Sequence, residues 1–494
     1  MGYAVSPEDL PVPGRDTYFW LGEINKASAV INSDEGLLDP DAARRIASGL
    51  QKLLDSGNEP NAPRPSLVIT FEPLLIQVAG VEATLLHAGR SSQDMLTTVS
   101  TAILRDAVLK LALQLHDTTR RLVEMAETHA ATLVPNYTNG VAAQPNSYGH
   151  YLLGHIAGLH RDAERLQQCY SRLDRCAMGT TVLNGTSWPL ERERMAKYLG
   201  FAKVVDNAYD AAQITAAEMP VELGSIASHI ALHTGAYIQD VMAQYSQPRP
   251  WILLQEGGDN TYVSSAMPQK RNPGLLNNTR AEASRVVTLG VGRAIQGHNL
   301  PPGMVDAKNL ADNLAVLNGA TRVLRDWQRI LNALVVDGKR SLKELDLDWT
   351  ASQELADVLM REHKVPFRVG HHFASEVVRY AKAKDLCPSE FPYAEASRIF
   401  VATLKHTNLE RSGYQFLDEQ EFREALDPAG IVNRRATSGG PQPKEMERMI
   451  NGSKQILEDL QRWVQERRSH IDNSLQELDA EFKLLHDPPN LPRP

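Results

Sequence analysis

The sequence has few of the features that mark secreted, membrane-bound or metal-binding proteins. Its 494 residues include three cysteines, Cys169, Cys176 and Cys387, whose spacing forms neither a disulfide framework nor a metal site. We expect structural thiols. No window of about 20 residues is apolar enough to span a membrane, and the N-terminus lacks the apolar segment of a secretory signal. These absences predict a soluble, cytoplasmic protein with no membrane partner.

The sequence also lacks a strong excess of one sign of charge. The 60 acidic and 52 basic residues give a net charge of −8, without a long basic run. Because neutralising phosphates takes a clustered basic face, nucleic acid is not expected as a partner. The sequence has no nucleotide-binding loop and no cluster of metal ligands, so we expect neither a cofactor nor a metal.

Alternating apolar strands with hairpin turns are scarce, whereas helical patterns are long. From Leu104 to Met125 apolar or small residues recur at spacings of four and three, which predicts a helix packed lengthwise against near-parallel neighbours. Residues 221–245 are apolar or small around most of the circumference and predict a helix covered on most sides. Heptad spacing returns between Leu457 and Leu485. These patterns predict an all-α fold.

The same patterns divide the chain into three parts. Asp39-Pro40 predicts a helix start, because an aspartate N-cap precedes a proline in the first turn. This helix belongs to an N-terminal helical domain, residues 1–95. Residues 96–350 hold the longest helices and predict a central bundle. Residues 351–494 predict a small C-terminal helical domain with a C-terminal helix, and the last fifteen residues, ending HDPPNLPRP, are expected to form a loose tail.

One loop interrupts the helical patterns, the stretch TYVSSAMPQKRNPG at residues 261–274. Pro268 and Pro273 prevent it from forming one regular helix. Beside two serines, it carries a lysine and an asparagine, whose donors suit a carboxylate. A mobile loop with a hydroxyl beside a cation suits proton abstraction. On residue chemistry alone, an exposed polar turn is the alternative.

The segment SSAMPQKRNP resembles the signature loop of the fumarase/aspartase superfamily, Gly-Ser-Ser-x-Met-Pro-x-Lys-x-Asn-Pro, with Val263 in place of the glycine. Two more blocks, LLHAGRSSQDM at 85–95 and VPNYTNGVAAQPNSYGHYLL at 134–153, resemble the other active-site regions of that superfamily, in the same order. The argininosuccinate lyase branch is the most similar, as three further segments indicate: residues 183–201, 363–381 and 433–443.

This resemblance implies a nearly all-helical subunit of three domains, whose central helices form a 20-helix bundle in a homotetramer. Each active site would draw the three regions from three different subunits. The implied reaction is a β-elimination from a succinyl-bearing substrate, a dicarboxylate. A serine of the loop removes the proton beside a carboxylate, and the resulting dianion expels the nitrogen and leaves fumarate. Stabilising that dianion is mainly an electrostatic task.

The resemblance also implies the roles of individual residues. Ser264 is the base, with Ser265 beside it. Lys270 and Asn272 hold the succinyl carboxylates, on a loop that also carries Met267 of the signature. The other positions that match substrate-binding residues are Arg90, Ser91 and Gln93 for one carboxylate, Thr138 and Ser187 for the other, and Asn139.

Two departures from the family occur together. Asn139 replaces a histidine taken as the general acid, and Asn277 replaces the glutamate that orients it. Because an amide is no general acid near pH 7, Asn139 could only orient the substrate. Either His150 or another nearby group protonates the leaving nitrogen, or the leaving group is an alkylamine that already carries its proton and departs unaided. We favour the alkylamine.

The segment that grips the arginine portion in argininosuccinate lyases has changed as well. In HNLPPGMVDAKNLADN, residues 298–313, Met304 falls at the position of a tyrosine and Asp306 near a basic residue. Upstream, residues 213–217 replace an Asp-Arg-Asp segment. Changes of this kind discriminate strongly between substrates, and they argue against argininosuccinate.

We therefore predict a carbon–nitrogen lyase that acts on an N-substituted aspartate and releases fumarate with an amine or amino acid. The alternatives are an argininosuccinate lyase with an unusual acid, another reaction of the superfamily such as a cycloisomerisation, and a catalytically inactive structural homologue. The leaving amine, the direction of the reaction and the identity of the basic serine stay open.

Overall fold

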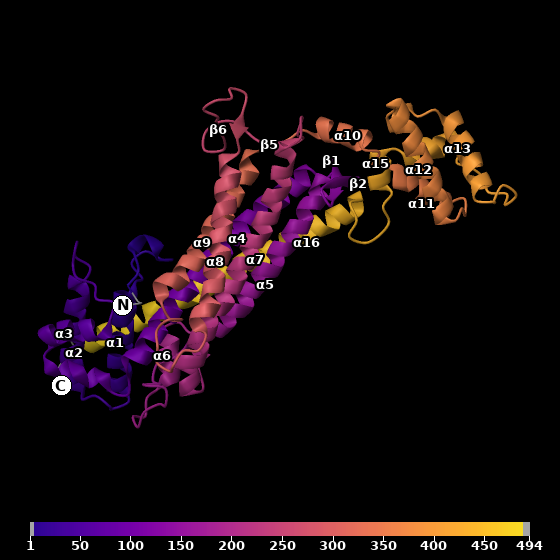
Figure 1. Ribbon diagram of the computed structural model, residues 1–494. Helices are drawn as coiled ribbons and strands as arrows, with labels where there is room; N and C mark the ends of the chain where they lie inside the picture. The colour runs from indigo at the N-terminus through magenta and orange to yellow at the C-terminus, as the bar shows by residue number, and fades with distance from the viewer. Residues whose placement is uncertain (1–3, 488–494) are drawn as a thin grey trace.

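The computed structural model, in which residues 4–487 are described, is a rod of long helices with a group of short helices at one end (Figure 1). The long helices pack side by side. They are α4 (Ser92–Thr128), α5 (Tyr148–Leu173), α7 (Thr215–Tyr245), α8 (Gly274–Gly297), α9 (Leu310–Ala333) and α16 (Pro443–His486). The heptad and all-round apolar patterns thus lie in α4, α7 and α16, and the prediction of an all-α fold is confirmed.

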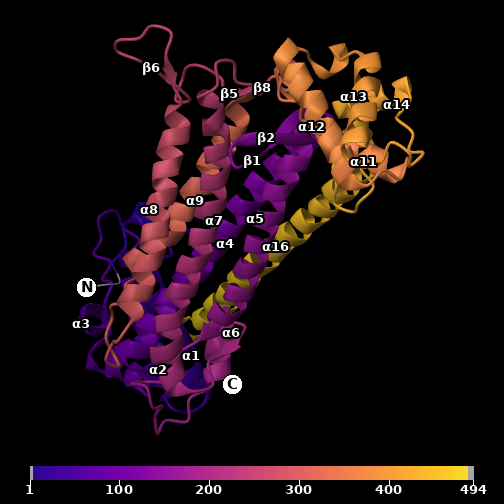
Figure 2. The same ribbon diagram turned by 45° about the vertical axis from the view of Figure 1, so that its right-hand side comes forward.

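The shorter helices lie at the two ends of the rod (Figures 1 and 2). One end holds α1 (Thr17–Asp34), α2 (Pro40–Ser56), α3 (Val68–Ala79) and α6 (Arg192–Tyr198). The other holds α10 (Gly338–Leu347), α11 (Ser352–Arg361), α12 (Phe367–Lys384), α13 (Tyr393–His406), α14 (Glu419–Ala425) and α15 (Pro428–Asn433). As predicted, Asp39 caps α2, accepting from the backbone N–H groups of Asp41 and Ala42. Short 3-10 helices occur at Pro7–Asp9, Val81–His87 and Pro388–Glu390, and Asp210–Ile214 is a π-helix.

In the part of the chain that the structure describes, the strands are short and form four pairs. The antiparallel pairs are β1 (Leu133–Thr138) with β2 (Val141–Ser147), β5 (Ile252–Leu254) with β8 (Leu334–Val336), and β6 (Tyr262–Val263) with β7 (Arg271–Asn272). The parallel pair is β3 (Arg175–Cys176) with β4 (Lys203–Val204). Two of the antiparallel pairs, β1–β2 and β6–β7, hold sequence blocks that resemble active-site regions.

Two hydrophobic cores organise the chain. The larger joins α1 and α2 to the long helices, including α16, and the smaller lies within α11–α15 and the residues that connect them. Helix α16 starts beside the short helices and returns along the rod to α1 and α2. The tail predicted for the last fifteen residues begins too early, because α16 continues to His486; residues 488–494 lie outside the described part. The division into three domains stays a prediction.

The cysteines agree with a structural role. Cys169 lies in α5 and Cys176 in β3, and both are buried. Burial raises the pKa of Cys169 to about 12 and that of Cys176 to about 11, so both thiols stay protonated near neutral pH. Between residues 4 and 487, no helix has both the length and the apolar content needed to cross a membrane.

A buried arginine fastens α4 to the elements that follow α5 and α6. Arg105 is fully buried and donates to the carboxylate of Asp174 at 2.7 Å. It also donates to the backbone oxygens of Leu199, at 3.0 Å, and of Gly200. Its guanidinium lies 3.7 Å from the ring centroid of Phe201, a distance that suits a cation–π contact. Losing one partner of such a buried pair leaves the other charge uncompensated.

We expect Arg105→Leu to lower the free energy of unfolding by about 3–5 kcal/mol, because Asp174 and two carbonyls would stay buried without their donor. Urea denaturation followed by circular dichroism, at one protein concentration, measures the loss. Arg120→Leu on the same helix is the matched control. Its pair with Glu124 is about half exposed and contributes less than about 1 kcal/mol. Equal losses from both variants would contradict the role given to Arg105.

Candidate active site

The signature loop is a small hairpin at one end of the rod (Figure 2). Strands β6 and β7 pair Val263 with Arg271, and residues 264–270 form the tip. Ser264 organises the tip, because its Oγ accepts from the backbone N–H groups of Ala266 at 3.3 Å and Met267 at 3.2 Å. The prediction that prolines would keep this loop from being helical is confirmed.

The reactive groups of this hairpin face solvent. Ser265, Met267 and Lys270 are exposed, and Ser264 is half-buried. In the described part of the chain, no acidic or basic side chain is hydrogen-bonded to the Ser264 hydroxyl or to the Lys270 ammonium. Asn272 donates to the backbone oxygen of Tyr262 at 3.4 Å. The hairpin therefore presents a hydroxyl and a cation that its own chain leaves uncovered.

The second sequence block forms the β1–β2 hairpin at the same end. Thr138 pairs with Val141, and the two residues between them make the turn. Asn139 has a φ of +52° and Gly140 a φ of +77°. Asparagine and glycine adopt positive φ more readily than other residues, so Asn-Gly is the preferred pair for a two-residue hairpin turn. Asn139 thus has a structural reason to be asparagine, and both it and Thr138 are exposed.

The third block lies at the opposite end of α4, and there Arg90 is buried. Its terminal nitrogens donate to Ser28 Oγ at 3.0 Å and Asn25 Oδ1 at 2.7 Å, both on α1. Its Nε is buried and has no hydrogen-bond partner among residues 4–487. Burial lowers the pKa of Arg90 to about 10, which still leaves it protonated at neutral pH. Arg90 therefore holds α1, and its contact with a substrate carboxylate stays a prediction.

Ser91 and Asp94 form a capping box at the start of α4. The Ser91 N–H donates to Asp94 Oδ1 at 2.8 Å. The other oxygen of Asp94 accepts from the N–H groups of Gly179 and Thr181, both at 3.0 Å. Burial raises the pKa of Asp94 to about 6. The first turn of α4 thereby fixes the start of the loop that carries Ser187, whose side chain is exposed.

Gln93 connects this turn to the segment that departs from argininosuccinate lyases. Its Nε2 donates to the backbone oxygen of Gly303 at 3.0 Å, and its Oε1 accepts from Lys308 Nζ at 3.4 Å. The N–H of Gly303 donates in turn to Gln213 Oε1 at 2.9 Å. Met304 and Asp306 are exposed beside this network. The altered residues 213–217 and 298–313 therefore meet at Gln93.

One chain does not bring the predicted site residues together. Arg90, Ser91, Gln93 and Ser187 lie at the end of the rod near α6, whereas Thr138, Asn139 and the signature hairpin lie at the other end (Figure 2). The 37 residues of α4 separate the two groups, a length of about 55 Å at the rise of an α-helix. No dicarboxylate can contact both groups within one chain.

Two further residues bear on the missing general acid: His150, named above as a possible replacement, and Lys308 of the altered segment. His150 lies on α5, with its Nε2 2.9 Å from the backbone oxygen of Gly439, and its buried Nδ1 has no partner in the described residues. Because a carbonyl only accepts, Nε2 carries the proton and the ring is engaged with the backbone at Gly439. Lys308, which lies in the altered segment 298–313, is 5% exposed. Its burial arises from packing of the loop and left no signal in the sequence.

Among the residues that the structure describes, no group of three or more histidine, cysteine, aspartate or glutamate side chains is placed to hold a metal ion. The polar groups at both ends are hydroxyls, amides and cations. Such donors bind carboxylates and stabilise negative charge.

Comparison with known proteins finds lyases that are similar to this chain over nearly its whole length. Residues 69–288 match a family model described as lyase, and residues 349–433 one described as argininosuccinate lyase C-terminal. An argininosuccinate lyase of Methanosarcina acetivorans is 27% identical over 472 residues, which cover 92% of this chain and 90% of that protein. One of Geobacillus kaustophilus is 28% identical over 436 residues, covering 85% and 89%.

Solved structures share the fold. EDDS lyase in complex with formate matches with a TM-score of 0.82 at 21% identity, covering 98% of this chain and 96% of its own. An EDDS lyase variant with bound fumarate matches with a TM-score of 0.81 at 22% identity, with the same coverage. The two family models, the relatives aligned along most of their length and the shared fold agree with the signature loop. The chain belongs to the fumarase/aspartase superfamily, in its argininosuccinate lyase-like branch.

Proposed function

We propose that the protein is a carbon–nitrogen lyase that eliminates an amine or amino acid from an N-substituted aspartate and leaves fumarate. The observation that carries this proposal is the signature hairpin, which keeps Ser264, Lys270 and Asn272 on an exposed tip. A purely structural role would not require a hydroxyl, a cation and an amide there. The relatives named argininosuccinate lyase and the EDDS lyase structures that hold formate or fumarate support a dicarboxylate substrate.

The chemistry assigned to the hairpin follows from the acidity of the substrate. A proton beside a carboxylate is very weakly acidic, so the dianion formed on its removal must be stabilised by fixed positive charge and hydrogen-bond donors. Ser264 takes the proton, and Lys270 and Asn272 bind the carboxylate that gains charge. Electrons of the carbon–nitrogen bond then move to the nitrogen, which leaves. The N–H groups of Ala266 and Met267, which donate to Ser264 Oγ, favour the alkoxide form that the base requires.

We infer that the active protein is a homotetramer, since the site residues lie at opposite ends of one chain. Neighbouring chains that run antiparallel would bring those ends together. A seam for such packing is open on α8, where Ala281, Ser284, Thr288, Val291 and Ile295 are exposed at heptad spacing. Val291 is 55% and Ile295 70% exposed. On α7, Leu232 is 60% exposed.

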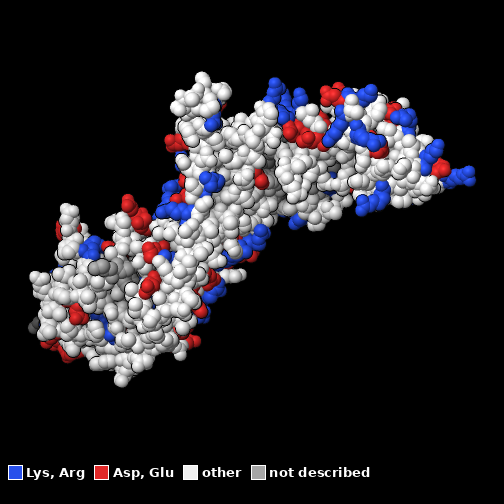
Figure 3. All heavy atoms as spheres, in the orientation of Figure 1, with Lys and Arg blue, Asp and Glu red and all other residues white. Residues whose placement is uncertain are grey.

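The distribution of charged side chains is consistent with packing of neighbouring chains along the rod. Charged side chains crowd the part formed by α11–α15 and are sparser along the middle of the rod on the face seen in Figure 3. Helices α7 and α8 approach each other closely, because a Cβ on Gly224 would lie 2.8 Å from the backbone oxygen of Gly290. This pair would pack as one unit against neighbouring chains. A location in the cytoplasm stays a prediction from the sequence.

The proposal predicts that the protein consumes fumarate in the presence of one class of amine or amino acid. Absorbance near 240 nm follows fumarate, with arginine included in the panel. Consumption with an alkylamine would identify an alkylamine as the leaving group, and consumption with arginine alone would identify an argininosuccinate lyase. No turnover with any member of the panel would contradict the lyase assignment and favour an inactive homologue.

The two serines of the hairpin have different expected effects. Ser264→Ala removes the proposed base and should lower kcat by about 10²–10⁴-fold, the usual contribution of such a group. Ser265→Ala, one residue away on the same exposed tip, is the control and should retain most activity. Both variants should keep the thermal unfolding temperature of the native protein. The reverse order of activities would assign the base to Ser265.

A further inference from the structure

Lys308 is a buried cation that lacks a carboxylate partner. It is 5% exposed, and its Nζ donates to the backbone oxygen of Ala212 and to Gln93 Oε1, at 3.4 Å. None of the described residues forms a salt bridge with it. Buried charges are normally paired, because transfer of an ammonium from water is costly without a counter-ion. An unpaired buried lysine is therefore a candidate for chemistry.

The position of Lys308 places it at the reaction. Gln93 belongs to the block assigned to substrate carboxylate binding, and the loop of Lys308 to the stretch that corresponds to leaving-group binding. The amine thus lies where the dicarboxylate end and the leaving-group end of a substrate would meet. The carbonyl of Ala212 comes from the π-helix Asp210–Ile214, an irregularity found frequently at functional sites.

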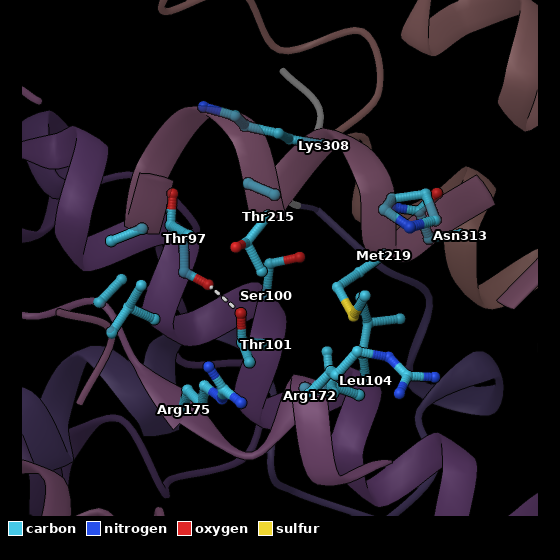
Figure 4. Close-up of a pocket in the computed structure, with 16 residues that line it drawn as sticks. Thr97, Ser100, Thr101, Leu104, Arg172, Arg175, Thr215, Met219, Lys308 and Asn313 are labelled. Carbon is cyan, nitrogen blue, oxygen red and sulfur yellow. Dashed lines mark hydrogen bonds between the residues drawn. The ribbon is translucent and has the colours of Figure 1, made fainter. Parts of the chain in front are cut away.

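The surroundings of Lys308 are polar but not acidic. It borders a cavity of ≈ 30 Å³, enough for a water molecule, together with Thr97, Ser100, Thr215 and two arginines. In Figure 4 these hydroxyl side chains lie between Lys308 and Arg175. Thr97 lies one turn along α4 from Gln93, and its buried hydroxyl has no hydrogen-bond partner in the described residues.

The charged groups of the surrounding elements do not compensate Lys308. Arg172 and Arg175, which line the cavity, are cations. The acidic side chains are engaged elsewhere or exposed: Glu222 of α7 pairs with Arg172, Asp210 accepts from Thr215 at 2.8 Å, Asp312 of α9 lies 3.5 Å from Arg293, and Asp306 is exposed. Burial consequently lowers the pKa of Lys308 to about 8. A group that titrates close to the working pH can both give and accept a proton.

We propose that Lys308 is the proton donor to the departing nitrogen, an inference that rests on the lyase function proposed above. In the elimination, the Ser264 alkoxide of one chain takes the carbon-bound proton, and the electrons of that C–H bond form the carbon–carbon double bond. The carbon–nitrogen electrons pass to nitrogen, and Lys308 Nζ–H of another chain gives its proton to that nitrogen. In the addition of an amine to fumarate, neutral Lys308 removes a proton from the incoming ammonium. Solvent returns a proton to Lys308 and takes one from Ser264, which restores the starting state. The alkylamine that departs unaided is then unnecessary.

The test compares Lys308→Met and Lys308→Arg with Lys203→Met, an exposed lysine of β4. We expect kcat/KM of elimination to fall about 10²-fold or more in both Lys308 variants, the usual contribution of a general acid. Lys308→Arg keeps the charge and the hydrogen bonds but cannot release a proton near neutral pH. In the native enzyme the rate should decline as pH rises through about 8, because the donor loses its proton, and Lys308→Met should lack this decline.

Three results separate the possibilities. Activity of Lys308→Arg close to native, or an unchanged pH profile in Lys308→Met, would overturn the proton transfer and assign Lys308 to positioning Gln93. Unchanged fumarate binding in both variants, measured by thermal shift, excludes loss of folding as the cause of lower activity. A native enzyme without turnover on any amine overturns the lyase function and this inference together.

Discussion

Helix α4 imposes the constraint on which the rest of the structure depends. Its 37 residues run uninterrupted from the capping box at Ser91 to Thr128, so the first and last turns are about 55 Å apart. The two ends of the helix carry different parts of the candidate site, and a rigid helix cannot bring them together. The proposed function therefore requires unlike ends of different chains to meet.

The contacts of α4 suit this requirement, because they hold its first turns in a fixed place. At the start, the Asp94 carboxylate binds three backbone N–H groups and fixes the loop before Ser187. About three turns further on, Arg105 binds Asp174 and the backbone at residues 199 and 200. At the other end the β1–β2 hairpin is held by Tyr137, whose hydroxyl accepts from Gln244 and Trp251, whereas the exposed tip at Ser264 carries no such side-chain contact to another element among the described residues.

The leaving-group side of the site differs in character from the hairpin side. The hairpins present exposed hydroxyls and amides, whereas Gln93, Gln213, Gly303 and Lys308 form a connected and largely buried network. A buried network discriminates between ligands more strongly than an exposed one, because any group left unpaired is costly. Of the positions that differ from argininosuccinate lyases, Gln213 belongs to this network, and Met304 and Asp306 are exposed beside it.

The sequence predicted the parts of the fold that depend on local pattern. Heptad spacing predicted α4 and α16, an apolar pattern around most of the circumference predicted α7, and Asp39-Pro40 located the start of α2. The signature residues identified the reactive hairpin, since their spacing is local. The burial of Arg90 and Lys308 was not predictable, because both are charged residues in polar segments and packing of distant elements decides their exposure. The Asn139-Gly140 turn carried a local hairpin signal that was read only as the loss of a histidine.

The sharing of each site between chains is the central claim, and co-expression of two inactive variants tests it directly. Ser264→Ala damages the hairpin end, and Gln93→Glu places a negative charge at the carboxylate-binding end. Mixed tetramers should regain about a quarter of the native rate, because each site draws its two ends independently from different chains. Mixed tetramers without activity, from variants that fold and assemble, would contradict the shared site and require both ends to act within one chain.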